Sequence, residues 1–297
     1  GRILKNSKKL VIFGGVYSTG FYENILTEKV ADVVIKHEGE VQINNLLSFW
    51  DKSEHSEIYN LSFNHNNKIY GFIKKYEKVK PASIKKELKK LKGTYKDYSK
   101  YGTFGHMTSA LVGDRIHGSI IGNRGCRSSC TFCSVPNFMG PKVRSTDTNV
   151  TIETIKYMYN ELGVQHIDWL DDDIVAYKDQ TIELFNEISK LNYDLKFTIQ
   201  NAVLARDISE ETVDALVSAG FVQIGFGVES GNIDIRKKIQ RVTLIDNLKD
   251  SISWFRKKNP DIFIHCNFMI GFPNEKVYQI KQTIDLALDL AVDWCQF

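Results

Sequence analysis

Short apolar segments alternate with longer amphipathic segments along the second half of the chain. Apolar runs typical of buried strands occupy Gly118–Gly122, His166–Leu170, Leu195–Ile199, Val222–Val228 and Ile262–Ile270. Apolar residues at helical spacing predict helices over Val150–Leu162, Gln180–Leu191, Glu210–Ala219, Ile245–Lys257 and Val277–Leu290. A sixth strand would begin at Trp294. This alternation predicts an α/β fold in which parallel strands, joined by right-handed crossovers, form a curved sheet or partial barrel with the helices outside.

Helix-capping residues stand where this alternation requires them. Gly163 and Gly220 each follow a predicted helix, in the position that favours a left-handed C-cap. Ser209 precedes the third helix, and Glu210 and Glu211 lie in its first turn, where the helix dipole favours carboxylates. Because the loops after the strands carry the chemistry in such folds, we expect the functional residues at the carboxyl ends of the strands.

The first 73 residues follow a different pattern. Buried-type strands are expected over Lys9–Phe13 and Ala31–Ile35, a helix over Val41–Trp50, and a hairpin that pairs Ile58–Phe63 with Lys68–Ile73. Two parallel-type strands are few for a doubly wound sheet, so we expect residues 1–73 to be part of a Rossmann-like domain and the chain to be a fragment at both ends. Residues 74–117 would form a linker, lysine-rich over Lys74–Lys96, and residues 118–297 the barrel.

The composition is that of an ordinary globular protein and excludes several function classes. The chain has 297 residues, 42% of them hydrophobic and 25% charged, and no apolar run approaches the ~18 residues of a membrane-spanning helix. The net charge of +3 is too small to indicate nucleic acid by itself, and the first residues are too polar for a secretory signal. We therefore expect a cytoplasmic protein with neither a membrane nor a nucleic acid as its partner.

Three of the five cysteines lie together, in the loop after the first barrel strand. Cys126, Cys130 and Cys133 fall within eight residues, and Gly125 allows the turn that would wrap the backbone around a soft metal centre. A structural zinc site would need a fourth ligand such as His106 or His117, and free thiols would rarely cluster in this way. An iron–sulfur cluster held by three cysteines fits best, because one iron stays open for chemistry. Cys266 and Cys295 are expected in the core.

The cysteine spacing of three and then two residues, with Phe132 before the last cysteine, resembles the signature of radical S-adenosylmethionine (SAM) enzymes. The flanking residues Asn123–Gly125 and Ser134–Pro136 are similar to those of radical SAM proteins with a cobalamin-binding domain, and nearly as similar to those of methylthiotransferases. The resemblance implies a [4Fe–4S] cluster whose open iron chelates SAM, and an electron donor such as flavodoxin or ferredoxin. One electron then cleaves the sulfonium and yields a 5′-deoxyadenosyl radical.

The same resemblance implies roles for residues at the other strand ends. One of Asp171, Asp172 and Asp173 would hold the SAM amino group, and the residues leave open which. Glu229, in the segment Gly225–Gly231, would accept hydrogen bonds from the ribose or amino group, and Arg241 would pair with the SAM carboxylate. The remaining expected SAM contacts are Gln200 and Asn201 at the methionine end, and Gly271 and Phe132 at the adenine.

The first fifty residues resemble the second half of a cobalamin-binding domain. In that family, paired glycines such as Gly14 and Gly15 approach the nucleotide tail, and a turn such as Glu38–Glu40 opens a helix. The resemblance implies a cobalamin-dependent methyltransferase acting on an unactivated carbon of a small molecule or peptide. The alternatives are a methylthiotransferase acting on tRNA or protein, and a zinc-stabilised RNA-binding protein. Methylthiotransferases carry three more cysteines in the N-terminal domain, and none precedes Cys126 here.

Overall fold

The computed structural model describes residues 10–49, 61–65, 68–71, 111–140, 142–241 and 244–297. The chain divides into an N-terminal unit, within residues 1–81 and 134–142, and a barrel unit, within residues 82–133 and 143–297. The lysine-rich stretch Lys74–Lys96 and His106 lie outside the described residues, so the domain boundaries stay a prediction. Segment 134–142, which falls inside the predicted barrel, groups with the N-terminal unit.

The N-terminal unit is a four-stranded sheet between helices. Its elements are β1 (Ile12–Gly14), α2 (Val16–Gly20), α3 (Tyr22–Thr27), β2 (Val33–Ile35), α4 (Glu40–Phe49), β3 (Leu61–His65), β4 (Lys68–Gly71) and α8 (Val135–Met139). The strand order is β1-β2-β3-β4, with β1 and β2 parallel and β3 and β4 in an antiparallel hairpin. This confirms both expected strands, the helix and the hairpin.

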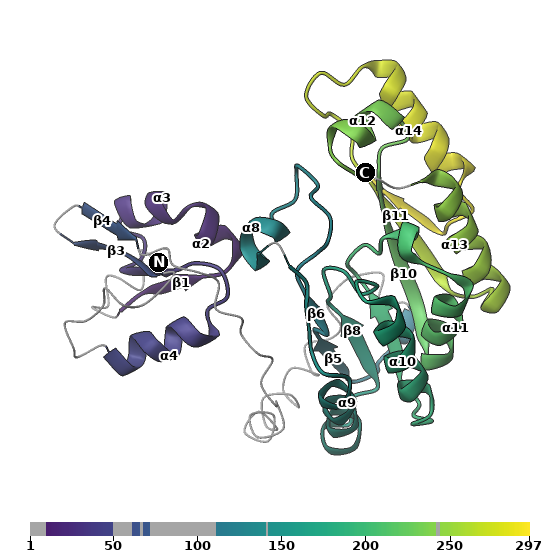
Figure 1. Cartoon of the computed structure of the whole chain (residues 1–297), viewed down its shortest axis with the longest axis horizontal. Helices are drawn as coiled ribbons and strands as arrows, with labels where there is room; N and C mark the ends of the chain where they lie inside the picture. Colours follow the sequence, from purple (N-terminus) through teal and green to yellow (C-terminus); the bar gives the residue numbers. More distant parts are fainter. Residues whose placement is uncertain (1–9, 50–60, 66–67, 72–110, 141, 242–243) are drawn as a thin grey trace. The chain divides into compact units, whose positions relative to one another are not determined.

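Both faces of this small sheet are covered, because successive strand residues point to opposite sides. Val34 packs with Ile25 and Leu26 of α3, whereas Val33 and Leu46 of α4 belong to a separate apolar cluster. Figure 1 shows α3 and α4 on opposite sides of the strands, as the two clusters require. The sequence pattern did not predict α2 and α3, which are only five and six residues long.

The barrel unit is a six-stranded parallel sheet with helices outside, as predicted. Its principal strands are β5 (His117–Ile120), β8 (His166–Trp169), β9 (Lys196–Ile199), β10 (Phe221–Glu229), β11 (Phe263–Phe268) and β12 (Trp294–Gln296). The connecting helices are α9 (Thr148–Leu162), α10 (Lys178–Ser189), α11 (Glu210–Ala219), α13 (Ile245–Lys258) and α14 (Val277–Asp289). The strand order β12-β11-β10-β9-β8-β5 follows the chain, and every neighbouring pair is parallel.

Shorter elements complete this unit. They are a two-stranded antiparallel ladder of β6 (Asn123–Arg124) and β7 (Arg144–Ser145), the 3-10 helix η3 (Ala205–Asp207) and helix α12 (Ile233–Lys238). The helix caps form as expected. Gly163 and Gly220 adopt left-handed C-cap conformations, and the Ser209 side chain accepts a hydrogen bond from the Thr212 amide at the start of α11.

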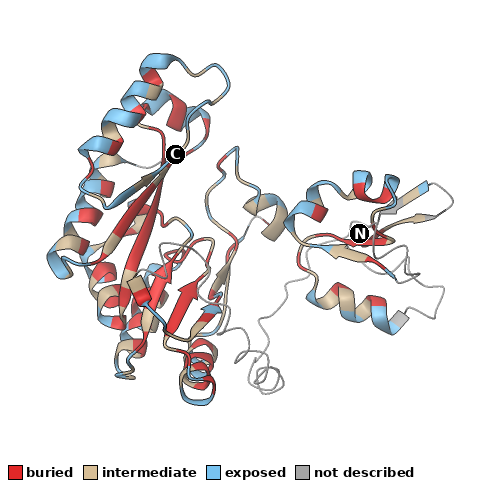
Figure 2. Cartoon of the chain, turned by 180° about the vertical axis from the view of Figure 1, so that it is seen from behind, coloured by how far each residue is buried: buried red, intermediate tan, exposed pale blue. Residues whose placement is uncertain are grey.

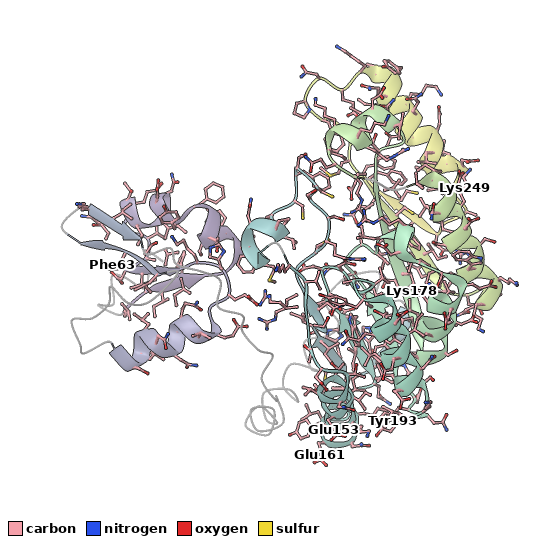
Figure 3. The ribbon with its side chains drawn as sticks, viewed as in Figure 1. Phe63, Glu153, Glu161, Lys178, Tyr193 and Lys249 are labelled. Atoms are coloured by element: carbon pink, nitrogen blue, oxygen red, sulfur yellow. The ribbon has the colours of Figure 1, made fainter. Side chains whose placement is uncertain are left out.

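The two faces of the barrel sheet differ in polarity. Trp169 of β8 stacks edge-on against Phe185 of α10, with ring centroids 4.9 Å apart, so this side of the strands faces the helices. His166 and Asp168, the alternate residues of β8, lie on the inward side, and both are buried. Figure 2 shows buried strands in the centre and helices whose outer faces are exposed, and Figure 3 shows Lys249 on the outward side of α13. The core therefore lies between sheet and helices, and the inner face is polar.

The chain contains no helix in its described part that is both long enough and apolar enough to cross a membrane.

A candidate cysteine-loop site at the carboxyl ends of the barrel strands

The three clustered cysteines lie in one loop at the carboxyl edge of the barrel sheet. We call residues 122–133, which follow β5, the cysteine loop. Gly125 has a φ of 92°, so the turn into Cys126 uses the left-handed backbone that glycine tolerates. Cys130 is buried, and Cys126 and Cys133 are half-buried. The Cys133 amide donates to the Cys130 carbonyl at 3.0 Å, which closes a turn between the last two cysteines.

The three cysteines of the cysteine loop are candidate ligands for a metal centre. All three cysteines are free thiols. Among the described residues, no group of three or more His, Cys, Asp and Glu side chains gathers closely enough to hold one metal ion.

The structure does not bring His117 to the cysteines as a zinc ligand. This residue begins β5, at the opposite end of the strand from the cysteine loop. Its ring lies against His166, with the two Nδ1 atoms 3.0 Å apart, and its Nε2 atom is 3.9 Å from Asp168. His117 therefore belongs to a buried polar group inside the barrel.

The end of β8 carries the three expected aspartates, and their contacts are with the cysteine loop. Asp171 accepts a hydrogen bond from the Gly122 amide, Asp172 accepts one from the Gly125 amide, and Asp173 pairs with Arg127 at 2.8 Å. Arg127 thus supplies a positive charge beside three adjacent carboxylates, which would otherwise repel one another. Sequence analysis missed this residue, although its position between two cysteines was visible.

Burial dominates the electrostatics of Asp171. This residue is 4% exposed, and burial raises the pKa of its carboxyl to about 7, against hydrogen bonds from the Asn123 and Gly122 amides that lower it. Asp171 also borders a cavity of about 20 Å³, which has room for one water molecule. The Asp171 carboxyl is therefore closed off from solvent, and its contacts are with other groups of the protein.

The end of β10 carries Glu229 in an unusual backbone conformation. Its φ is 69°, which is rare for a residue with a side chain, and the register of β10 against β11 shifts between Gly227 and Glu229. A bulge of this kind redirects a side chain at a functional edge. Glu229 is buried, and burial raises the pKa of its carboxyl while Arg241 lowers it.

Arg241 is buried beside the cysteine loop. It is 8% exposed, so it is no surface arginine. Its Nε and Nη2 atoms donate to the Gly227 carbonyl at 3.1 and 2.6 Å, its Nη1 atom lies 3.8 Å from the Cys130 sulfur, and Nη2 lies 3.8 Å from Glu229. A side chain at Gly227 would collide with this guanidinium. Arg241 thus links β10 to the cysteine loop.

The segment before Arg241 also holds the cysteine loop. The Thr131 amide donates to the Ile239 carbonyl at 3.1 Å, and the Ser129 hydroxyl donates to Gln240 at 2.9 Å. Gln240, like Glu229, has a positive φ, at 57°. No local sequence signal marked Ile239 and Gln240, because their role depends on a loop more than a hundred positions away.

The other expected SAM contacts lie at the same edge of the sheet. Asn201 follows β9 and donates to the Leu170 and Asp171 carbonyls at 3.0 and 3.2 Å, so it ties the ends of β8 and β9 together. Gln200 is half-buried beside it and hydrogen-bonds to Asp168.

Phe132 and Gly271 form part of the exposed rim. The Phe132 ring is 42% exposed and lies 6.4 Å from the ring of Phe272. The Glu275 carboxylate accepts hydrogen bonds from the Gly271 and Phe272 amides at 2.6 and 3.1 Å, which fixes the turn after β11.

Gly14 and Gly15 lie at the carboxyl end of β1 in the N-terminal unit. Their carbonyls accept hydrogen bonds from the Ser18 and Thr19 hydroxyls at 3.1 and 2.8 Å. The His37 amide, just after β2, donates to the Thr19 hydroxyl at 2.8 Å. The loops after the two parallel strands are therefore joined, at the edge where α/β sheets bind their ligands.

Proteins of known sequence are similar to this chain, one of them over almost its whole length and another over little more than half of it. The chain is 25% identical over 296 residues to an uncharacterized methyltransferase of Pyrococcus horikoshii, covering 98% of this chain and 60% of the relative. It is 27% identical over 183 residues to cytidylyl-2-hydroxyethylphosphonate methyltransferase of Streptomyces wedmorensis, covering 59% of this chain and 33% of that enzyme. The chain therefore spans well under two thirds of the length of these relatives.

Solved structures share the fold. The radical SAM methyltransferase TsrM of Kitasatospora setae, solved with its tryptophan substrate and a SAM analogue, aligns with a TM-score of 0.74 at 13% identity, covering 96% of this chain and 54% of TsrM. The cobalamin-dependent radical SAM enzyme OxsB aligns with a TM-score of 0.69 at 16% identity, covering 96% of this chain and 40% of OxsB.

The family model for the radical SAM superfamily matches residues 120–287. This match covers more than half of the chain and contains the cysteine loop and the ends of β8, β9, β10 and β11. The protein is therefore a member of the radical SAM superfamily.

Proposed function

We propose that the protein cleaves SAM reductively at a [4Fe–4S] cluster held by Cys126, Cys130 and Cys133, and uses cobalamin to methylate an unactivated carbon. The observation that carries the proposal is the placement of these three free thiols in one loop at the carboxyl edge of a parallel barrel sheet. Three cysteines leave one iron of such a cluster without a protein ligand. That iron would bind SAM, and the cluster would supply the electron that breaks the sulfonium bond.

The residues around the cysteine loop would bind and orient SAM, and they would exclude water from it. Arg241 places a buried cation beside Cys130 and orders the end of β10. Glu229, redirected by its bulge, is the candidate hydrogen-bond acceptor for the SAM ribose or amino group. Because the Arg241 guanidinium is already engaged by the Gly227 carbonyl, its pairing with the SAM carboxylate requires a donor that faces away from β10.

The remaining SAM contacts keep their proposed roles. Gln200 and Asn201 would meet the methionine end, and Phe132 and Gly271 the adenine. All four lie in segments that follow strands of the barrel sheet or in the cysteine loop.

Cobalamin would bind at the N-terminal unit, with Gly14 and Gly15 approaching its nucleotide tail. The joined loops after β1 and β2 support this placement. TsrM, which shares this fold, has been solved with cobalamin and a [4Fe–4S] cluster bound. We further propose a small-molecule or peptide substrate and an electron donor such as flavodoxin or ferredoxin.

Methylthiolation of tRNA or protein is the second candidate. The ribosomal protein uS12 methylthiotransferase RimO of Pseudothermotoga lettingae is 29% identical over 171 residues, covering 54% of this chain and 39% of that enzyme. Corrinoid content and the reaction product separate the two candidates. Bound corrinoid with about four irons per chain supports methyl transfer, whereas about four irons without corrinoid, together with a methylthiolated RNA or protein product, supports methylthiolation.

The cysteine loop itself provides the primary test. Anaerobic reconstitution with iron and sulfide should give a brown protein with about four irons per chain that forms 5′-deoxyadenosine from SAM and dithionite. Replacing Cys126, Cys130 or Cys133 by alanine should abolish deoxyadenosine formation. Cys295→Ala is the matched control, because Cys295 is a half-buried thiol on β12 and should leave iron content and turnover unchanged. A wild-type protein that takes up no iron under these conditions would rule out the proposal.

A further inference from the structure

Two consecutive carboxylates at the end of β8 accept hydrogen bonds from two backbone amides of the cysteine loop. The Oδ1 atom of Asp171 accepts from the Gly122 amide at 2.5 Å, and the Oδ2 atom of Asp172 accepts from the Gly125 amide at 2.9 Å. Both amides precede the first cysteine, so these contacts fix the backbone as it enters the turn at Cys126.

Asp173 continues the series inside the cysteine motif. Its Oδ2 atom accepts from the backbone amide and the Nε atom of Arg127 at 3.3 and 2.8 Å, and its Oδ1 atom accepts from Nη2 at 3.2 Å. This is a bidentate pair, and the Asp173 side chain is wholly buried. The Arg127 Nη2 atom also donates to the Val175 carbonyl and to Asp207, each at 3.0 Å.

These contacts leave Asp171 and Asp173 poorly placed to hold a ligand. Asp171 and Asp173 are 4% and 2% exposed, and each already accepts hydrogen bonds from the cysteine loop. Loss of such a carboxylate would leave backbone amides of the cysteine loop without their acceptor, which is costly for groups shielded from water.

We infer that Asp171, Asp172 and Asp173 are positioning residues that fix the cysteine loop in its cluster-binding shape, and that the buried pair Asp171 and Asp173 are not ligands of the SAM amino group. The inference rests on the proposed function, because it assumes that the three cysteines hold a [4Fe–4S] cluster. Groups that orient metal ligands are commonly worth about 10- to 100-fold in metal affinity.

Substitutions in the Asp173–Arg127 pair should shift the midpoint potential of the cluster in a way that damage to the loop structure alone would not. Arg127 directly follows Cys126, and Asp173 pairs with Arg127, so both charges would act on a cluster held by this cysteine. Because a cluster gains negative charge when it is reduced, Asp173→Asn should raise its midpoint potential and Arg127→Gln should lower it. Damage to loop structure alone would not shift the two variants in opposite directions.

The experiment compares the wild-type protein with Asp173→Asn, Arg127→Gln and Asp293→Asn. Asp293 is the matched control, because it accepts from a backbone amide (Ile264, 2.7 Å) and from an arginine (Arg256, 2.6 Å) at the amino-terminal edge of the sheet. Iron retention against a chelator, the midpoint potential by redox-titrated electron paramagnetic resonance and the KM for SAM are measured for each protein.

We expect Asp173→Asn to retain the cluster about 10- to 100-fold less tightly with the KM for SAM unchanged, and the control to match the wild type. Wild-type retention and potential in Asp173→Asn, or a raised KM for SAM as its only defect, would overturn the inference and leave the proposed function standing. If Asp173→Asn does not fold, Asp172→Ala decides, because Asp172 is half-buried and alanine has no oxygen to accept from the Gly125 amide. Absence of iron in the wild type would instead overturn both proposals.

Discussion

At the scale of single residues, the inner face of the barrel holds a buried polar group that the catalytic proposal does not use. The His166 Nε2 atom lies 2.8 Å from the Thr198 hydroxyl, which also hydrogen-bonds to Asp168. Burial, together with the positive charges of His117 and Arg115, lowers the pKa of His166 to about 3, so the imidazole stays neutral at physiological pH. His166 therefore takes part in the hydrogen bonds of the barrel interior as a neutral imidazole.

This neutral histidine makes the stability of the barrel unit depend on pH. Between pH 6.5 and about 3, the unfolded chain binds a proton at His166 that the folded chain does not, so acidification favours unfolding. Within this interval His166 should lower the unfolding free energy by about 1.4 kcal/mol for each unit that the pH falls.

His166→Gln should remove this dependence, so the difference in stability between wild type and variant should shrink as the pH falls from 7 to 5. Asp168, whose pKa is raised by burial, acts in the opposite direction and is common to both proteins. Urea unfolding at the two pH values measures the difference, with Lys249→Gln on the surface of α13 as the control. A difference that stays constant between pH 7 and 5 would contradict the assignment.

At the scale of elements, the left-handed C-caps of α9 and α11 make different contacts. A Cβ atom at Gly163 would lie 3.6 Å from the Ile116 side chain, an ordinary contact. A Cβ atom at Gly220 would lie 2.6 Å from the Leu195 carbonyl oxygen, which belongs to the backbone and cannot easily move. The turn from α11 into β10 is therefore packed against the start of β9.

Replacing each C-cap glycine by alanine should separate two losses of stability, that from backbone strain and that from a steric clash of the added Cβ atom. Gly163→Ala should lower the unfolding free energy by about 1–2 kcal/mol, the cost of left-handed backbone for an L-residue. Gly220→Ala should cost about 1–3 kcal/mol more, because overpacking adds to the strain. Chemical unfolding of both variants measures the difference, and equal losses would show that the backbone at Gly220 adjusts freely.

At the scale of the whole molecule, the two proposed cofactors are assigned to different units. Gly14 belongs to the N-terminal unit, whereas the cysteine loop belongs to the barrel unit. A Cβ atom at Gly14 would lie 3.7 Å from the Ile35 carbonyl, so the fold tolerates alanine there. Any effect of this substitution on a cofactor would then come from the approach of the cofactor itself.

Gly14→Ala should bind hydroxocobalamin roughly tenfold more weakly, a loss of about 1.4 kcal/mol, with unchanged iron content and melting temperature. Gly20→Ala is the control, since no atom lies within 4 Å of its added Cβ and it lies at the end of α2. Corrinoid absorbance after gel filtration measures binding. Equal corrinoid content in the two variants would remove Gly14 from the proposed cobalamin site.

Much of the fold was accessible from the sequence because its signals are local. The pattern gave α11 its observed bounds, Glu210–Ala219, and placed the other barrel strands and helices within a few residues. The short elements α2, α3, α8 and α12 were missed, because five or six residues carry too little periodicity. Glu229 was a predicted SAM contact because it is a carboxylate at the end of a strand. Its positive φ could not be predicted, because it accompanies the register shift of β10 against β11.

By itself, the sequence determined the alternation of strands and helices and the cysteine spacing, since each depends on residues that are neighbours along the chain. Only the tertiary structure decided which charges meet. Asp173 and Arg127 are 46 positions apart, and Arg241 and Cys130 are 111 apart, so their contacts depend on the places that β5, β8 and β10 take in one sheet. The physical reason is that burial and hydrogen bonding assign a partner to each buried charge, and both exist only once the sheet has formed.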